Sequence, residues 1–150
     1  MIISGSNPVH VQQAVEALCA GELLGLPTET VYGLAADASN ETAVAKIFKA
    51  KGRPSNHPLI VHVASVAEVN QFASDVPDFA QKLMAQFWPG PLTLILPRRA
   101  EMAAAAAGGQ NSVGLRCPSH PVAVEVLKAC AAKGVWGLAA PSANLFGRVS

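Results

Sequence analysis

Short apolar runs and helix-like apolar stripes alternate along this chain, and glycine or proline separates most of them. The runs predict strands, at about 23–26, 59–63, 92–96, 113–116 and 135–140. Apolar residues three and four positions apart predict helices, at about 8–20, 41–50, 66–72, 77–87 and 121–131. Because strands and helices take turns along the sequence, the chain is predicted to have an α/β fold.

Three of the predicted helices begin with a capping signal. Asn7 precedes a proline, Asn40 precedes Glu41, and Ser65 is followed three residues later by Glu68, as in a capping box. Two other segments give weaker signals. Residues 28–34 are polar at their start and contain a glycine, so they are predicted to form a loop. Residues 103–109, five alanines and two glycines, fit either a short helix or a mobile loop.

The composition fits one domain with a sizeable core, since the chain has 150 residues, of which 51% are hydrophobic and 14% charged. No apolar stretch approaches the ~20 residues that a membrane span needs. Residues 1–5 have neither the basic flank nor the apolar core of a signal peptide. These features predict a cytoplasmic protein with no membrane partner.

The net charge of +1 comes from cations that are spread thinly along the chain. A protein that wraps a nucleic acid usually carries a basic stripe, whereas a small anionic ligand needs only a few cations. Cys19, Cys117 and Cys130 are odd in number and form no CxxC pair, so they are predicted to be buried, reduced thiols. The four histidines lack ligand spacing, and no metal site is predicted.

Lys51-Gly52-Arg53 is the strongest local signal for chemistry. Two cations one residue apart, on a loop between a helix and a strand, can point into one cleft. Arginine forks onto phosphate oxygens and lysine adds a compact charge, so a step that builds negative charge on phosphorus gains from the pair. On local grounds alone, a solvated basic turn is the commoner explanation.

Two polar turns also follow predicted strands. Residues 28–33 place hydroxyls beside a carboxylate and could hold a small substrate, or could be an ordinary threonine-rich turn. Residues 141–144 could offer N–H groups and hydroxyls to an anion, or could be a plain β-turn. His62 fits a satisfied core histidine, and Arg116 fits either a surface arginine or a carboxylate clamp. The chain contains no GxxxxGK[ST], GxGxxG, GxSxG or HExxH motif.

Six segments match one family pattern when they are taken together and in order: Leu26–Leu34, Lys51–Pro54, Pro58–Val63, Trp88–Thr93, Val113–Pro118 and Ala140–Asn144. On these motifs the chain resembles the YrdC-like threonylcarbamoyl-AMP synthases from about residue 10 to residue 150. The resemblance implies a single domain over 1–150, with a twisted mixed sheet flanked by helices and a deep, positively lined cavity.

Members of that family condense L-threonine, bicarbonate and ATP to threonylcarbamoyl-AMP and pyrophosphate, with Mg²⁺. A separate threonylcarbamoyl transferase then passes the group to tRNA. The resemblance therefore implies a nucleotidyltransferase that meets tRNA only indirectly or weakly.

The resemblance also implies roles for particular residues. Lys51 and Arg53 would be catalytic and would face the ATP phosphates. The remaining nucleotide site would be formed by His57, Ser112, Ser142, Asn144 and Ser150. Threonine would be held by Thr28, Thr30, His62, Arg116 and the backbone around Ala140, with Arg116 taking the carboxylate.

Three departures from the family pattern bear on these roles. His57 stands where asparagine is common, and Phe146 replaces a small polar residue. Family members continue beyond the position of Ser150 with a serine and an arginine that complete both sites, so the chain is expected to lack that segment. A double-stranded-RNA or tRNA-binding module and an inactive paralogue are the alternatives. The scarcity of clustered cations argues against an RNA-binding module. The presence of Lys51 and Arg53 argues against an inactive paralogue.

Overall fold

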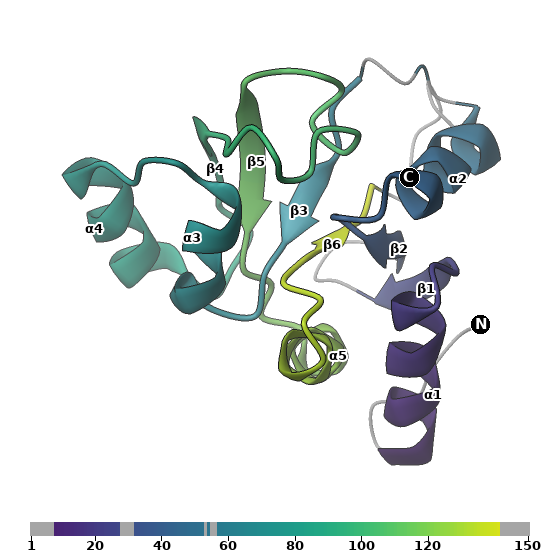
Figure 1. Ribbon diagram of the computed structural model, residues 1–150. Coiled ribbons are helices and arrows are strands. Elements are labelled where there is room, and N and C mark those ends of the chain that lie inside the picture. Colours follow the sequence, from purple (N-terminus) through teal and green to yellow (C-terminus); the bar gives the residue numbers. More distant parts are fainter. Residues whose placement is uncertain (1–7, 28–31, 53, 55–56, 142–150) are drawn as a thin grey trace.

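The computed structural model describes residues 8–27, 32–52, 54 and 57–141. In this part of the chain six strands form one sheet (Figure 1): β1 (Leu24–Pro27), β2 (Tyr32–Asp37), β3 (Ile60–His62), β4 (Thr93–Pro97), β5 (Ser112–Arg116) and β6 (Leu138–Ala139). Their order is β1-β2-β6-β3-β5-β4. β3 and β5 are parallel, and all other neighbours are antiparallel. The predicted α/β fold with a mixed sheet flanked by helices is confirmed.

One face of the sheet is covered by three helices: α2 (Glu41–Lys51), α3 (Val69–Phe72) and α4 (Asp78–Phe87). Alternate strand residues point to this side, and Val61, Leu94 and Leu115 are buried there with Ile47 and Phe72. This layer is the larger of two buried clusters and holds the centre of the sheet in place.

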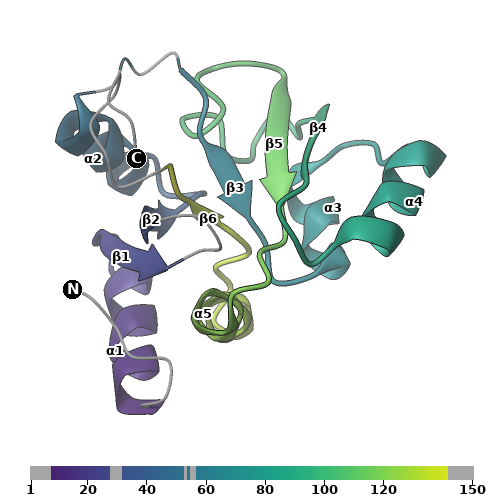
Figure 2. The same cartoon turned by 180° about the vertical axis from the view of Figure 1, so that it is seen from behind.

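The opposite face is covered by α1 (Pro8–Cys19) and α5 (Pro121–Ala132), but only at the β1-β2-β6 end. There Leu24, Ala35 and Leu138 share a buried cluster with Leu18 and Leu127. Seen from behind, β3 and β5 have no labelled helix in front of them (Figure 2). None of the described helices is long and apolar enough to cross a membrane.

Both ends of α2 are capped. The side chain of Asn40 accepts a hydrogen bond from the Ala43 N–H at 3.0 Å, so the predicted N-cap is confirmed. At the other end Gly52 has a φ of 62° and its N–H donates to the Lys49 carbonyl. These two caps set the position of Lys51 at the last helical residue.

Two strand predictions need correction. The loop predicted over 28–34 is wrong for residues 32–34, which begin β2. β2 lies between β1 and β6, so partners on both sides override its local glycine signal. The strand predicted over 135–140 comprises only Leu138–Ala139, since these two residues pair with β2 and β3.

The helix predicted over 66–72 consists of a 3₁₀ helix, Val66–Glu68, followed by α3. The Ser65 hydroxyl accepts from the Ala67 N–H and donates to the Glu68 carboxylate, so the two capping-box residues do meet. Residues 101–109 form successive turns rather than a regular helix. The cap predicted at Asn7 lies outside the described residues.

None of the three cysteines, all of which lie in the described residues, forms a disulfide, and Cys19 is exposed, which corrects the expectation that all three are buried. Cys117 and Cys130 are buried. Burial, with smaller contributions from Cys19 and Asp37, raises the pKa of Cys130 to about 12. The pKa of Asp37 is itself raised by burial, and a hydrogen bond from Ser39 N–H opposes that shift.

These environments predict selective alkylation, because the thiolate is the reactive form. Iodoacetamide at about pH 8 should modify Cys19 alone in the native protein and all three cysteines after denaturation. Peptide mass spectrometry would count and place the modifications. Rapid native labelling of Cys130 would contradict the burial and the raised pKa of its thiol.

Candidate active site

Part of the second sheet face lies beyond the reach of α1 and α5, where β3, β5 and β4 are neighbours. Residues paired across strands share a face, as do alternate residues within a strand. The pairing of Ile60 with Gly114, and of both His62 and Thr93 with Arg116, therefore defines one surface. We call this surface the open face, and its residues are Ile60, His62, Thr93, Ile95, Ser112, Gly114 and Arg116. Ile95 on this surface is 67% exposed.

Two of the predicted threonine-binding residues come together at one end of the open face. His62 and Arg116 end the parallel strands β3 and β5 and lie directly opposite each other. His62 is 3% exposed, whereas Arg116 is only partly buried. The Ala140 N–H donates to the Ile60 carbonyl at 3.1 Å, which places the Ala140 backbone beside the start of β3, at the other end of that strand from His62. The sequence named all three residues, and the register makes His62 and Arg116 neighbours.

Arg116 is oriented by the turn that precedes β4. Its Nε–H donates to the Gly90 carbonyl at 3.3 Å, and the Gly90 N–H donates to the Cys117 carbonyl at 2.8 Å. Thr93 is the cross-strand partner of Arg116. Sequence reasoning used residues 88–93 only as a family motif and assigned no role to Gly90 or Thr93.

The predicted nucleotide residues that the structure describes lie toward the opposite ends of the same strands. Ser112 begins β5, and Lys51 ends α2, from which residues 52–59 lead into β3. Lys51 is 4% exposed, and His57 is partly buried, with its N–H donating to the Pro54 carbonyl. In Figure 1 the starts of β3 and β5 lie in the upper part of the molecule, and their carboxyl ends lie below.

Several predicted site residues fall outside the described part of the chain: Thr28, Thr30, Arg53, Ser142, Asn144 and Ser150. Their predicted roles stay predictions. The last described residue before the second polar turn is Pro141, whose carbonyl accepts from the Leu34 N–H at 3.2 Å. This bond ties the start of that turn to β2.

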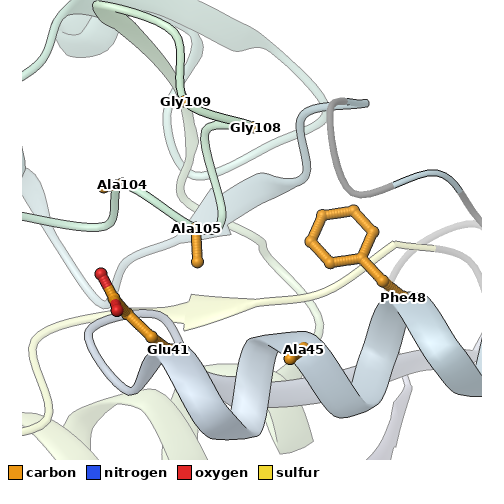
Figure 3. Close-up of a pocket in the computed structure, with 7 residues that line it drawn as sticks. All are labelled: Glu41, Ala45, Phe48, Ala104, Ala105, Gly108 and Gly109. Atoms are coloured by element: carbon orange, nitrogen blue, oxygen red, sulfur yellow. The ribbon is translucent and has the colours of Figure 1, made fainter.

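A pocket lies elsewhere, on the side of the sheet covered by α2. It holds about 500 Å³ between α2 and residues 104–109, and its walls include Glu41, Ala45 and Phe48 (Figure 3). Among its described lining residues one carboxylate is the only charged group. It therefore differs from the positively lined cavity that the family resemblance implies, and that cavity stays a prediction.

Within residues 8–27, 32–52, 54 and 57–141, no three His, Cys, Asp or Glu side chains gather into a metal site. A protein cage for Mg²⁺ is thus not offered by this part of the chain. Mg²⁺ is commonly bound through substrate phosphates and few protein ligands.

The fold and the open face define a mixed-sheet α/β domain in which an arginine ends one strand of the parallel pair. The family model Sua5/YciO/YrdC, described as "Telomere recombination", matches residues 16–150. The chain belongs to this family.

The relatives found by comparison carry more specific names. The threonylcarbamoyl-AMP synthase of Bacillus subtilis (strain 168) is 42% identical over 97% of this chain and 41% of its own length. That of Pyrococcus abyssi is 44% identical over 87% of this chain and 37% of its own length. A crystal structure of P. abyssi Sua5 complexed with L-threonine matches with a TM-score of 0.90 and 40% identity, over 96% of this chain and 41% of the other. The chain thus spans about 40% of the length of these relatives.

Proposed function

We propose that this chain is the catalytic domain, over residues 1–150, of a threonylcarbamoyl-AMP synthase that acts in the cytoplasm. The observation that carries the proposal is the pairing of His62 with Arg116 on the open face. Support comes from relatives with that name at 42% and 44% identity and from an L-threonine complex of a similar structure. Three cysteines that form no disulfide also fit a reducing compartment.

Threonine recognition would rest on Arg116. A guanidinium group binds a carboxylate with two parallel hydrogen bonds, and Lys cannot reproduce this fork. With the carboxylate held there, the threonine amine stays available for reaction. His62, the Ala140 backbone and the predicted residues Thr28 and Thr30 would complete the pocket around so small a substrate.

The reaction then proceeds along the open face. The amine attacks carbon dioxide derived from bicarbonate, loses a proton and becomes a carbamate, with one water released from bicarbonate. A carbamate oxygen attacks the α-phosphorus of ATP, and the bond to pyrophosphate breaks. Arg116 lies four residue steps along β5 from Ser112, about 13 Å at the usual strand rise. That distance suits a carboxylate at one end and phosphates at the other.

The nucleotide would lie toward the Ser112 end of the strands. Lys51 and Arg53 would stabilise the charge that builds on the phosphates, and no covalent enzyme intermediate is required. His57, Ser112, Ser142, Asn144 and Ser150 would line the same region. Mg²⁺ would enter on the ATP phosphates and neutralise part of their charge. A downstream transferase would take the product to tRNA, which this domain would meet indirectly or weakly.

A pyrophosphate-release assay with each substrate omitted in turn tests the proposed function. Release should require threonine, bicarbonate, ATP and Mg²⁺ together, and calorimetry should show threonine binding to the same chain. Equal release without threonine would contradict a synthase. An RNA-binding module would instead show neither turnover nor threonine binding, but an RNA affinity that falls steeply with salt.

A further inference from the structure

Gly90 makes two hydrogen bonds to consecutive residues at the end of β5. Its N–H donates to the Cys117 carbonyl at 2.8 Å, and its carbonyl accepts from Arg116 Nε–H at 3.3 Å. The first bond fixes the height of the turn along the strand. The second uses the Nε–H donor of Arg116 and so anchors one edge of the guanidinium group, which is rigid and planar. We call this pair of bonds the Gly90 bracket.

The position tolerates only glycine for a steric reason. A Cβ atom built on Gly90 would lie 2.6 Å from the carbonyl oxygen of Phe87, the last residue of α4. That oxygen belongs to the backbone and cannot swing away as a flexible side chain would. An alanine at this position must therefore displace the turn, and the Gly90 carbonyl moves with it.

The turn is anchored on both sides, so the carbonyl of Gly90 has a defined position. The Trp88 N–H donates to the Met84 carbonyl at 3.0 Å and ties the turn to α4. The Trp88 indole N–H donates to the Leu92 carbonyl at 2.8 Å and closes the turn from the other side. Thr93 then enters β4 opposite Arg116.

We propose, resting on the function proposed above, that Gly90 is a positioning residue that aims the Arg116 guanidinium group at the carboxylate of the substrate. A bidentate carboxylate contact through the two η nitrogens would use a part of the guanidinium group other than the Nε–H that donates to Gly90. Gly90 itself touches no reacting atom. Its effect on catalysis is transmitted through Arg116.

Gly90→Ala in the full chain tests this role with two readouts. The first is hydrogen exchange of the Arg116 Nε–Hε group by NMR, with the signal identified from its loss in Arg116→Lys. Exchange should be about tenfold faster in Gly90→Ala, since a hydrogen bond of ordinary net strength is lost. The second is calorimetry, in which threonine affinity should fall about tenfold while ATP affinity stays near that of the parent.

Two further variants separate positioning from general damage. Gly137→Ala also creates a clash, 2.8 Å from Val61 and 2.9 Å from Phe72, but within the core on the far side of the sheet. It should lower the melting temperature without selective loss of threonine affinity. Trp88→Phe keeps the glycine and removes only the indole bond to Leu92, so it should give a smaller change in both readouts even if Gly90→Ala folds poorly.

An unchanged rate of hydrogen exchange at the Arg116 Nε–Hε group in both Gly90→Ala and Trp88→Phe would overturn the Gly90 bracket. So would equal losses of threonine affinity in Gly90→Ala and Gly137→Ala, since general destabilisation would then explain both. If the parent chain bound no threonine, the proposed function would fail instead. The NMR exchange measurement would still decide whether Gly90 holds Arg116.

Discussion

Lys51→Met is expected to lower threonine-dependent pyrophosphate release by about 10²-fold or more, the scale for losing one preorganised electrostatic stabiliser. Lys51 is the last residue of α2 and only 4% exposed, so its ammonium group lies in a shielded environment where a charge acts strongly. Methionine keeps the apolar stem and removes the charge. The loss should therefore appear in kcat rather than in stability.

Lys49→Met is the matched control for that experiment. Lys49 lies in the same helical turn but is exposed, so its replacement should leave turnover within about twofold, as for surface changes of ±0.5 kcal/mol. The assay is pyrophosphate release at saturating threonine and ATP. Turnover in Lys51→Met equal to that of the parent would exclude this lysine from charge stabilisation.

Arg116→Lys should cost about 1.5–3 kcal/mol of threonine binding, the range for a charged hydrogen-bonded contact. Lysine keeps the positive charge but loses the planar fork and the Nε–H that reaches the Gly90 carbonyl. ATP affinity should change little, because the predicted nucleotide residues lie toward the other end of β5. Isothermal calorimetry with each ligand separately measures both effects.

Arg99→Lys provides the comparison for this second change. Arg99 also donates through Nε to a backbone carbonyl, that of Asn70, at 2.6 Å, but it lies outside the open face. Threonine affinity should be unaffected in this variant. Equal loss of ATP and threonine binding in Arg116→Lys would mean that the two ligands do not divide the open face as proposed.

The sequence predicted the elements whose signals are local. Asn40 caps α2 because its side chain needs only the next turn of its own helix. β2 was only partly predictable, since residues 32–34 carry a glycine and find their partners in distant strands. The two-residue length of β6 likewise follows from its pairing with β2 and β3 rather than from its own apolar run.

The candidate site shows the same division. His62 and Arg116 could be named individually, but 54 residues of sequence separation hide the fact that they face each other. The carbonyl of Gly90 could not be named at all, because a backbone acceptor has no signature in the sequence. The pairing register of the strands decides which polar groups share a site. The chemistry of single residues does not reveal that register.

Both outer strands of the sheet end in a proline, Pro27 in β1 and Pro97 in β4. The Pro97 carbonyl is also occupied on its outer side by the Ser74 N–H, at 2.9 Å. A strand from a second molecule could pair with only a short stretch of either edge strand, because proline supplies no N–H for continued pairing. The chain therefore carries its own protection against edge-to-edge aggregation, even though Ile95 exposes an apolar side chain on one of those strands.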